Sequence, residues 1–199
     1  SGLTHGPMLG KPKPTSMRVW VRTADPAQFR VVYDTKKPLT LKRESVTGET
    51  LAGKDNTGFV ELTNLKANTR YYYGVVTMIG LVDTRIEFDR PWPSFRTLPD
   101  ASNFVDSMNN KGGQFNLSFS IGCCSRQLLP NAPLGIYANP PSFLNLFKNH
   151  RDDIDFHIVN GDFTYEEVLN GTRAGYAANY KLYLERGRNM SNLFRYVPY

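Results

Sequence analysis

Apolar and polar residues alternate in short runs through the first half of the chain. Four runs, rich in β-branched and aromatic residues and separated by turn residues, predict strands: 16–23, 28–35, 58–65 and 70–80. A further run, 87–97, predicts an edge strand because Pro91 and Pro93 interrupt it. Roughly six or seven short strands with no helical period predict an all-β sandwich over residues 1–98.

The alternation in run 16–23 does not show which face of the predicted strand points into the core. Met17, Val19 and Val21 share one face of the predicted strand. The opposite face carries Trp20 between two arginines, and this ring could pack in the core or stack under the arginines.

The pattern changes after residue 98. Residues 99–114 are polar and rich in turn residues, which predicts a linker or a linker with a short helix. The remaining elements are expected to alternate as strand, helix, strand, helix, strand: 115–121, 141–149, 155–160, 174–193 and 195–199. The first of these strands has the composition of a buried strand. Such alternation is the opening of a parallel α/β sheet, so residues 115–199 are expected to begin a second domain.

This second domain is predicted to be incomplete. About 85 residues with two or three strands cannot cover both faces of a parallel sheet. We therefore expect the chain to be the N-terminal piece of a longer protein, or the rest of the sheet to be supplied separately.

A local motif in the β-domain concerns Tyr71. Leu65, a turn, Thr69 and Tyr71 resemble the tyrosine corner of fibronectin type III domains. The Tyr71 hydroxyl would then bond the backbone a few residues upstream. The alternative is a simple hairpin turn followed by a tyrosine-rich strand.

Charge and cysteine content narrow the function classes. The net charge is +6, and most of the positive excess lies in the first half. This excess indicates a solvated basic surface, with a site for anions or nucleic acid as the alternative. Because the chain has no run of five like charges and no basic helix, no specific nucleic-acid partner is expected. No apolar run approaches the roughly 20 residues of a membrane helix. The two cysteines, Cys123 and Cys124, are adjacent, which excludes a disulfide framework.

Candidate chemistry lies after the two predicted strands 115–121 and 155–160. Ligands of open α/β sheets bind at the carboxyl ends of strands, so Cys124 and Asp162 would be within reach of one ion if the strands are neighbours. Tyr165 is three residues past Asp162 and would point the same way in a first helical turn. A thiolate and a carboxylate bind a metal well, and a phenolate beside a carboxylate is a hard-donor pair that suits a trivalent ion.

Each of these residues also has a purely structural interpretation. A Gly-Asp pair after a strand is often a turn with a helix cap. A buried cysteine is usually a small apolar filler, and we assign this role to Cys123. Tyr165 alone could be a core residue. His157, inside the second strand, is expected to be a hydrogen-bonded core residue.

At these residues the sequence resembles a known family. Gly-Cys-Cys-Ser at 122–125 and Gly-Asp-Phe-Thr-Tyr-Glu at 161–166 are similar to motifs of PhoD-type alkaline phosphatases and phosphodiesterases. These belong to the calcineurin-like metallophosphoesterases and are related to purple acid phosphatases. Residues 5–7 (His-Gly-Pro) and 20–22 (Trp-Val-Arg) match the opening of the fibronectin-like domain in that family. The resemblance spans essentially the whole chain.

The resemblance implies hydrolysis of phosphate monoesters or diesters. Cys124 would be a thiolate ligand and Tyr165 a phenolate ligand of a ferric ion (Fe3+). Asp162, the candidate catalytic residue, would bridge that ion to calcium (Ca2+) or another divalent ion. The metals would polarise phosphoryl oxygens and activate a water or hydroxide that attacks phosphorus in line. The family is periplasmic or secreted, and no signal peptide is expected in this chain.

The resemblance also implies what is missing. The Asp-Asp-His motif and the later ligands of the family do not occur in this chain. The partners would be the phosphate ester and the remainder of the catalytic domain, and the fragment alone is expected to be inactive.

Two other hypotheses remain at this point. In one, the chain is a fibronectin-like binding module joined to a non-catalytic α/β stub, with Cys124 and Asp162 as packing and capping residues. In the other, the parent is a purple acid phosphatase-like enzyme, for which His-rich later motifs are expected.

Overall fold

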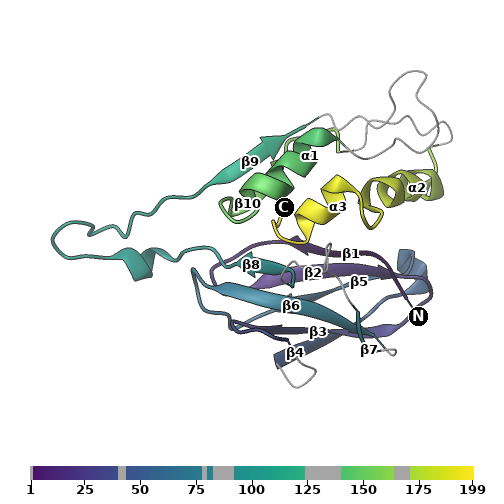
Figure 1. Ribbon diagram of the computed structural model, residues 1–199, viewed down its shortest axis with the longest axis horizontal. Helices are drawn as coiled ribbons and strands as arrows, with labels where there is room; N and C mark the ends of the chain where they lie inside the picture. Colours follow the sequence, from purple (N-terminus) through teal and green to yellow (C-terminus); the bar gives the residue numbers. More distant parts are fainter. Residues whose placement is uncertain (1, 40–43, 78–79, 83–91, 124–139, 164–170) are drawn as a thin grey trace.

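The fold consists of a β-sandwich with three helices and a pair of parallel strands above one of its sheets (Figure 1). The structure is a computed structural model that describes residues 2–39, 44–77, 80–82, 92–123, 140–163 and 171–199. Within these ranges, no helix has the length and apolar character needed to span a membrane.

Two antiparallel sheets form the sandwich. The first has the order β1-β2-β5: β1 (Leu3–Gly10), β2 (Met17–Thr23) and β5 (Thr57–Leu62). The second has the order β4-β3-β6-β7, with β8 also paired to β6: β3 (Gln28–Asp34), β4 (Glu44–Glu49), β6 (Arg70–Thr77), β7 (Gly80–Val82) and β8 (Ser94–Arg96). The prediction of a β-sandwich is therefore confirmed.

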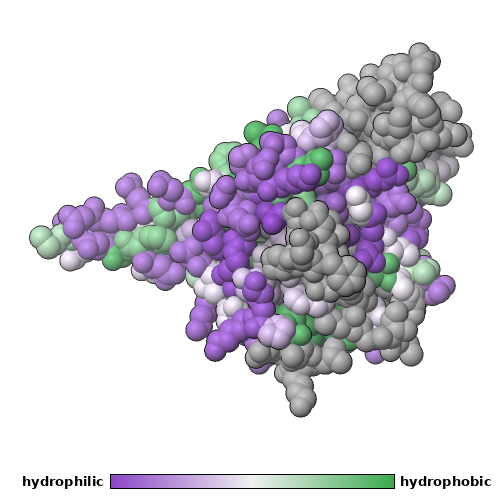
Figure 2. Space-filling model, in the orientation of Figure 1, coloured by the Kyte–Doolittle hydropathy of each residue, from purple (hydrophilic) through white to green (hydrophobic). Residues whose placement is uncertain are grey.

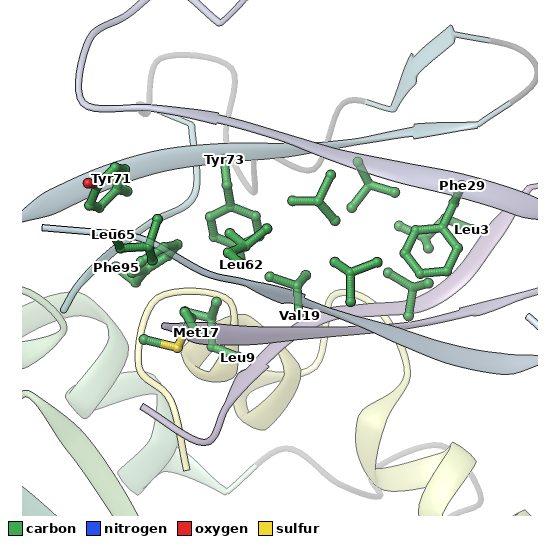
Figure 3. Close-up of a cluster of buried hydrophobic side chains, with 14 residues drawn as sticks. Leu3, Leu9, Met17, Val19, Phe29, Leu62, Leu65, Tyr71, Tyr73 and Phe95 are labelled. Atoms are coloured by element: carbon green, nitrogen blue, oxygen red, sulfur yellow. The ribbon is translucent and has the colours of Figure 1, made fainter. Parts of the chain in front are cut away.

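The sandwich core consists of the inward faces of both sheets (Figure 3). Met17, Val19 and Val21 of β2 are fully buried, which settles the orientation that the pattern left open. Tyr73 of β6 and Phe95 of β8 fill the core from the second sheet. Each buried side chain of this size stabilises the fold by about 1.5–3 kcal/mol relative to exposure.

The tyrosine corner is present. The Tyr71 hydroxyl accepts a hydrogen bond of 2.9 Å from the backbone N–H of Lys66, five residues upstream. The Tyr71 ring is buried and stacks on Phe95 at 5.7 Å between centroids. The hydroxyl thus holds the turn while the ring packs in the core, as the motif predicted.

Several strands differ from the prediction. β1, β4 and β7 were not predicted, because β1 is interrupted by Gly-Pro and β4 has mostly polar, exposed side chains. The pairing of β1 with β2 shifts register on both sides of His5. Gly6 lies there at φ +83°, and a Cβ atom would approach the carbonyl oxygen of Trp20 to 2.8 Å. Of the predicted strand 87–97, residues 94–96 form β8, and residues 87–91 lie outside the described residues.

The segment after the sandwich is an extended arm. It runs from β8 to β9 (Phe119–Gly122) and projects away from the body, as Figures 1 and 2 show. A short 3-10 helix, Ala101–Phe104, accounts for the predicted short helix. Figure 2 shows hydrophobic and hydrophilic residues mixed along the arm, and Met108 is 85% exposed.

β9 and β10 (Phe156–Val159) form a parallel pair, which confirms the pairing on which the candidate site depends. The prediction that residues 115–121 form a buried strand is wrong. Only its last part is a strand, and Phe119 and Ile121 are 52% and 61% exposed. His157 of β10 points toward the helices. Because successive residues of a strand point to opposite sides of the pair, Phe119 and Ile121 face away from the helices.

The helical elements also differ from the prediction. α1 (Pro141–Asn145) continues as a π-helical turn over Leu146–His150, close to the predicted 141–149. The predicted helix 174–193 is wrong in continuity, since α2 (Arg173–Leu184) and α3 (Asn189–Phe194) are separate helices. Gly187, at φ +88°, lies in the break and has a backbone conformation that a helix cannot contain.

The last five residues do not form the predicted strand. Residues 195–199 are a turn followed by irregular chain. This segment nevertheless lies beside β10, where the carbonyl oxygen of Pro198 accepts a hydrogen bond of 2.8 Å from the His157 N–H.

A second hydrophobic core joins the helices to the sandwich. Met8 on the outward face of β1 packs with Phe143, Met190, Phe194 and other side chains of α1 and α3. Leu9, the next residue of β1, is buried in the sandwich core instead. β1 therefore contributes to both cores, because successive residues of a strand point to opposite faces.

Candidate functional site

The carboxyl ends of β9 and β10 lie side by side. Gly122 is the register partner of Val159, and the N–H of Asn160 donates a 2.8 Å hydrogen bond to the carbonyl oxygen of Gly122. The two loops that carry Cys124 and Asp162 therefore begin at the same edge of the pair. Cys124 and Tyr165 themselves lie outside the described residues.

Asp162 is held at this edge by an unusual backbone. Gly161 has φ +83° and Asp162 has φ +46°, so two successive residues are in the left-handed region. Aspartate tolerates this region better than most residues do. The chain turns sharply after β10, and the Asp162 residue is exposed at the turn.

Asp162 is not the N-cap of α2. The N-cap of α2 is Thr172, whose hydroxyl oxygen accepts a 3.1 Å hydrogen bond from the N–H of Gly175. α2 thus has its own cap ten residues further along the chain.

Phe163 anchors the residue after Asp162, and sequence analysis missed this role. Its ring stacks on Tyr180 of α2 at 5.4 Å and on Tyr199 at 6.1 Å between centroids. The ring thereby ties the turn after β10 to α2. The available signal was an aromatic residue immediately after Gly-Asp.

Cys123 is exposed, so its predicted role as a buried apolar filler is wrong. It continues the alternation of Phe119 and Ile121, which are also exposed. Within the described residues, no element covers this face of the β9–β10 pair.

His157 is a core residue, as predicted. Its Nδ1 atom and the Ser120 hydroxyl share a hydrogen bond of 2.8 Å. The ring lies against Phe143 and Phe194, with centroids 5.8 and 5.7 Å away. Burial lowers the pKa of His157 below its usual value of 6.5, so the neutral ring is favoured.

Of the three predicted metal ligands, Asp162 is the one that the structure describes. Among the described residues there is no cluster of three or more His, Cys, Asp or Glu side chains that could hold a metal ion. An exposed carboxylate beside a second strand end suits a hard cation, but further donors are needed. The motif residues Cys124 and Tyr165 remain predicted donors.

Comparisons with known proteins give a fold and one family model that matches part of the chain. Residues 1–82 match the model of a domain of unknown function, DUF7800. No curated protein matches the sequence. The solved structure entitled "Structure of PhoD" has a TM-score of 0.68 at 15% identity, covering 96% of this chain and 36% of that chain. The protein therefore has a PhoD-like fold and spans about a third of the length of that structure.

Fibronectin-type structures are also similar, but over less of the chain. Chicken CNTN1 FN1-FN3 domains match with a TM-score of 0.28 and 17% identity, covering 37% of this chain and 25% of that chain. The third fibronectin III domain of human KIAA0343 protein matches with a TM-score of 0.32 and 13% identity, covering 48% of this chain and 82% of that chain.

Proposed function

We propose that this chain is the N-terminal part of a metal-dependent phosphomonoesterase or phosphodiesterase of the PhoD type. The observation that carries the proposal is the parallel pairing of β9 with β10, which starts both motif-bearing loops at one edge. The PhoD-like fold over 96% of the chain supports it independently of those motifs.

The proposed roles follow the donor chemistry. Cys124 and Tyr165 would hold a ferric ion through sulfur and phenolate oxygen, and Asp162 would be shared with calcium or another divalent ion. When bound, these ions supply Lewis-acid stabilisation of phosphoryl oxygens and lower the pKa of water. The left-handed turn at Gly161 and Asp162 would present the carboxylate, and Phe163 would keep that turn in place.

The exposed face of β9 and β10 supports the proposal that the catalytic domain continues beyond this segment. Phe119 and Phe156 stack at 5.4 Å between centroids, and Ile121 lies beside Ile158 in the parallel register. Parallel sheets are covered on both faces in known proteins. The remainder of the catalytic domain would cover this face and complete the site for a phosphate ester, in a periplasmic or secreted enzyme.

The test uses the full-length protein. Asp162→Asn is expected to lose bound metal and hydrolysis of p-nitrophenyl phosphate together, because a shared ligand serves more than one ion. Tyr165→Phe is expected to remove the visible charge-transfer absorption of a ferric phenolate while leaving the fold intact. Metal content is measured by mass spectrometry, absorption by visible spectroscopy and folding by circular dichroism.

Asp153→Asn is the matched control, because Asp153 is an exposed aspartate in the turn before β10. It should keep the metal, the colour and the activity. A colourless, iron-free parent protein would instead favour the fibronectin-like binding module with a non-catalytic α/β stub. A Tyr165→Phe variant with full colour would remove Tyr165 from the ligand set.

A further inference from the structure

A pocket of about 520 Å³ lies between the outward face of the β1-β2-β5 sheet and α2. Its floor includes Trp20 and Phe59, which are register partners on β2 and β5. Its other wall includes Tyr180 and Lys181 of α2. The residues proposed for the strand-end site, Asp162 among them, are not among the described residues that line it.

The pocket is strongly basic. Five cationic side chains line it, against one carboxylate, Asp55: Lys11, Arg18, Arg22, Arg173 and Lys181. An excess of positive charge in a concave site attracts negatively charged ligands.

Internal pairing uses only part of this positive charge. Arg22 bonds both carboxylate oxygens of Asp55 at 3.2 and 3.3 Å, and the Lys181 ammonium reaches Asp55 at 2.8 Å. The hydrogen bonds from Arg22 are the main cause of the lowered pKa of Asp55, so this carboxylate stays charged. Arg18 pairs with Glu61 at 3.3 Å.

Lys11 and Arg173 have no ion-pair partner in the part of the chain that the structure describes. Arg173 donates a 3.3 Å hydrogen bond to the carbonyl oxygen of Gly53, which is neutral, so no carboxylate among the described residues compensates its charge. Both residues are exposed at the pocket. Together they offer two positive charges to a ligand.

The aromatic side chains of the pocket are exposed to an unusual degree. Phe59 is 49% and Tyr180 is 45% exposed, although both are large rings. The Arg18 guanidinium lies 4.1 Å from the Phe59 ring centroid and covers one face of that ring. Exposed rings beside cations form a surface on which a flat ligand can stack while its charge is neutralised.

We propose that this pocket binds a small aromatic dianion. Its flat ring would lie against Phe59 on the floor and Tyr180 on the α2 wall. Its anionic groups would pair with Lys11 and Arg173. The two cations that lack a carboxylate partner among the described residues match a double negative charge, and the volume of the pocket accommodates a ligand of one or two fused rings.

The test measures binding of naphthalene-1,5-disulfonate to the full-length protein by isothermal titration calorimetry. This probe is a flat dianion and is not a phosphate ester, so binding does not depend on hydrolysis. Sulfate carries the charge without the ring, and 1,5-dihydroxynaphthalene carries the ring without the charge. We expect both comparators to bind at least ten-fold more weakly than the disulfonate, and added salt to weaken disulfonate binding.

Variants separate the contribution of the two cations from that of the aromatic ring. Lys11→Gln with Arg173→Gln should weaken disulfonate binding about ten-fold or more, and Phe59→Ser about five-fold or more. Lys148→Gln, an exposed lysine of the π-helical turn that does not line the pocket, is the control and should bind as the wild type does.

Three results would overturn the proposal. The first is no binding of the disulfonate, as when another segment of the full-length chain fills the pocket. The second is equal binding of the disulfonate and the neutral diol. The third is equal weakening by Lys148→Gln and by the double variant. Circular dichroism and thermal unfolding of each variant show that the fold is retained. Since the probe is not a substrate, loss of phosphatase activity would leave this result unaffected.

Discussion

At the scale of single residues, the Tyr71 hydroxyl holds the turn that precedes β6. It accepts the N–H of Lys66, while the ring stacks on Phe95. Tyr71→Phe keeps the ring and removes the acceptor of that N–H. Because Lys66 is exposed and water can replace the lost partner in part, we expect a loss of about 1 kcal/mol in the free energy of unfolding. Urea denaturation measures this loss.

Tyr72→Phe is the control for the corner. Tyr72 is the next residue on β6, and its ring lies 4.9 Å from the Lys37 ammonium without a hydrogen bond that closes the turn. This variant should leave the denaturation midpoint nearly unchanged. Equal midpoints for Tyr71→Phe and the wild type would mean that the corner contributes nothing to stability.

At the scale of elements, β10 is connected to its neighbours through His157. The side chain bonds Ser120 of β9, and the ring packs on α1 and α3. The backbone N–H bonds Pro198 in the last segment of the chain. One buried neutral imidazole therefore lies among four segments, and its protonation would place a charge among aromatic rings.

The pH dependence of stability follows from this burial. The pKa of His157 is lowered in the folded state from 6.5, so the folded protein binds fewer protons than the unfolded chain just below pH 6.5. The stabilisation is fully present above pH 6.5 and is lost as pH falls below it. We expect the free energy of unfolding to decrease from pH 7 to pH 5, with a smaller decrease in His157→Gln. Urea titrations at several pH values measure both slopes.

His5 accounts for part of the pH dependence of stability that the His157→Gln variant keeps. Its ring lies between β1 and α2, where Nε2 and the Lys181 carbonyl oxygen share a 2.9 Å hydrogen bond. Burial is the main cause of its lowered pKa, and the Lys181 bond opposes that shift. A His157→Gln variant with the full wild-type slope would contradict the assignment of the pH effect to His157.

At the scale of the whole molecule, polar contacts link the sandwich to the segments above it. The Tyr73 hydroxyl donates a buried 2.6 Å hydrogen bond to the Arg195 carbonyl oxygen. Burial raises the pKa of Tyr73 well above 10, so the hydroxyl keeps its proton. Arg96 of β8 pairs with the buried carboxylate of Asp155 at 2.5 Å, and Asp155 also accepts the N–H of Ser118 at 3.0 Å.

Asp155→Asn tests this connection. The substitution keeps an oxygen for the Ser118 N–H but removes the charge that pairs with Arg96. We expect a loss of about 2 kcal/mol in the free energy of unfolding, since hydrogen bonds to charged groups are the stronger ones. Chemical denaturation followed by fluorescence measures it.

Asp153→Asn, two residues earlier and exposed, should change the free energy of unfolding by less than about 0.5 kcal/mol. Equal effects of the two substitutions would show that the Arg96–Asp155 pair does not hold the two parts together.

The sequence by itself determined the sandwich and the tyrosine corner, because both depend on short-range patterns. A period of two, turn residues and the Leu65–Tyr71 spacing are local features, and burial of alternate side chains enforces them. Whether β9 pairs with β10 was left open by the sequence, because the two strands are distant along the chain, and the structure shows the pairing. The chemistry of Cys124 and Tyr165 remains a prediction from motifs.

Tertiary contacts decided the rest. An apolar stripe does not show that the predicted helix 174–193 breaks near Gly187, because the side chains on both sides of the break pack into the same second core. The apolar composition of 115–121 indicated burial, yet the described chain has no second layer to cover Phe119 and Ile121. The basic pocket joins β1, β2, β5 and α2, which are more than 100 residues apart in sequence at the extremes. Only folding brings such distant side chains together, and no local pattern encodes their juxtaposition.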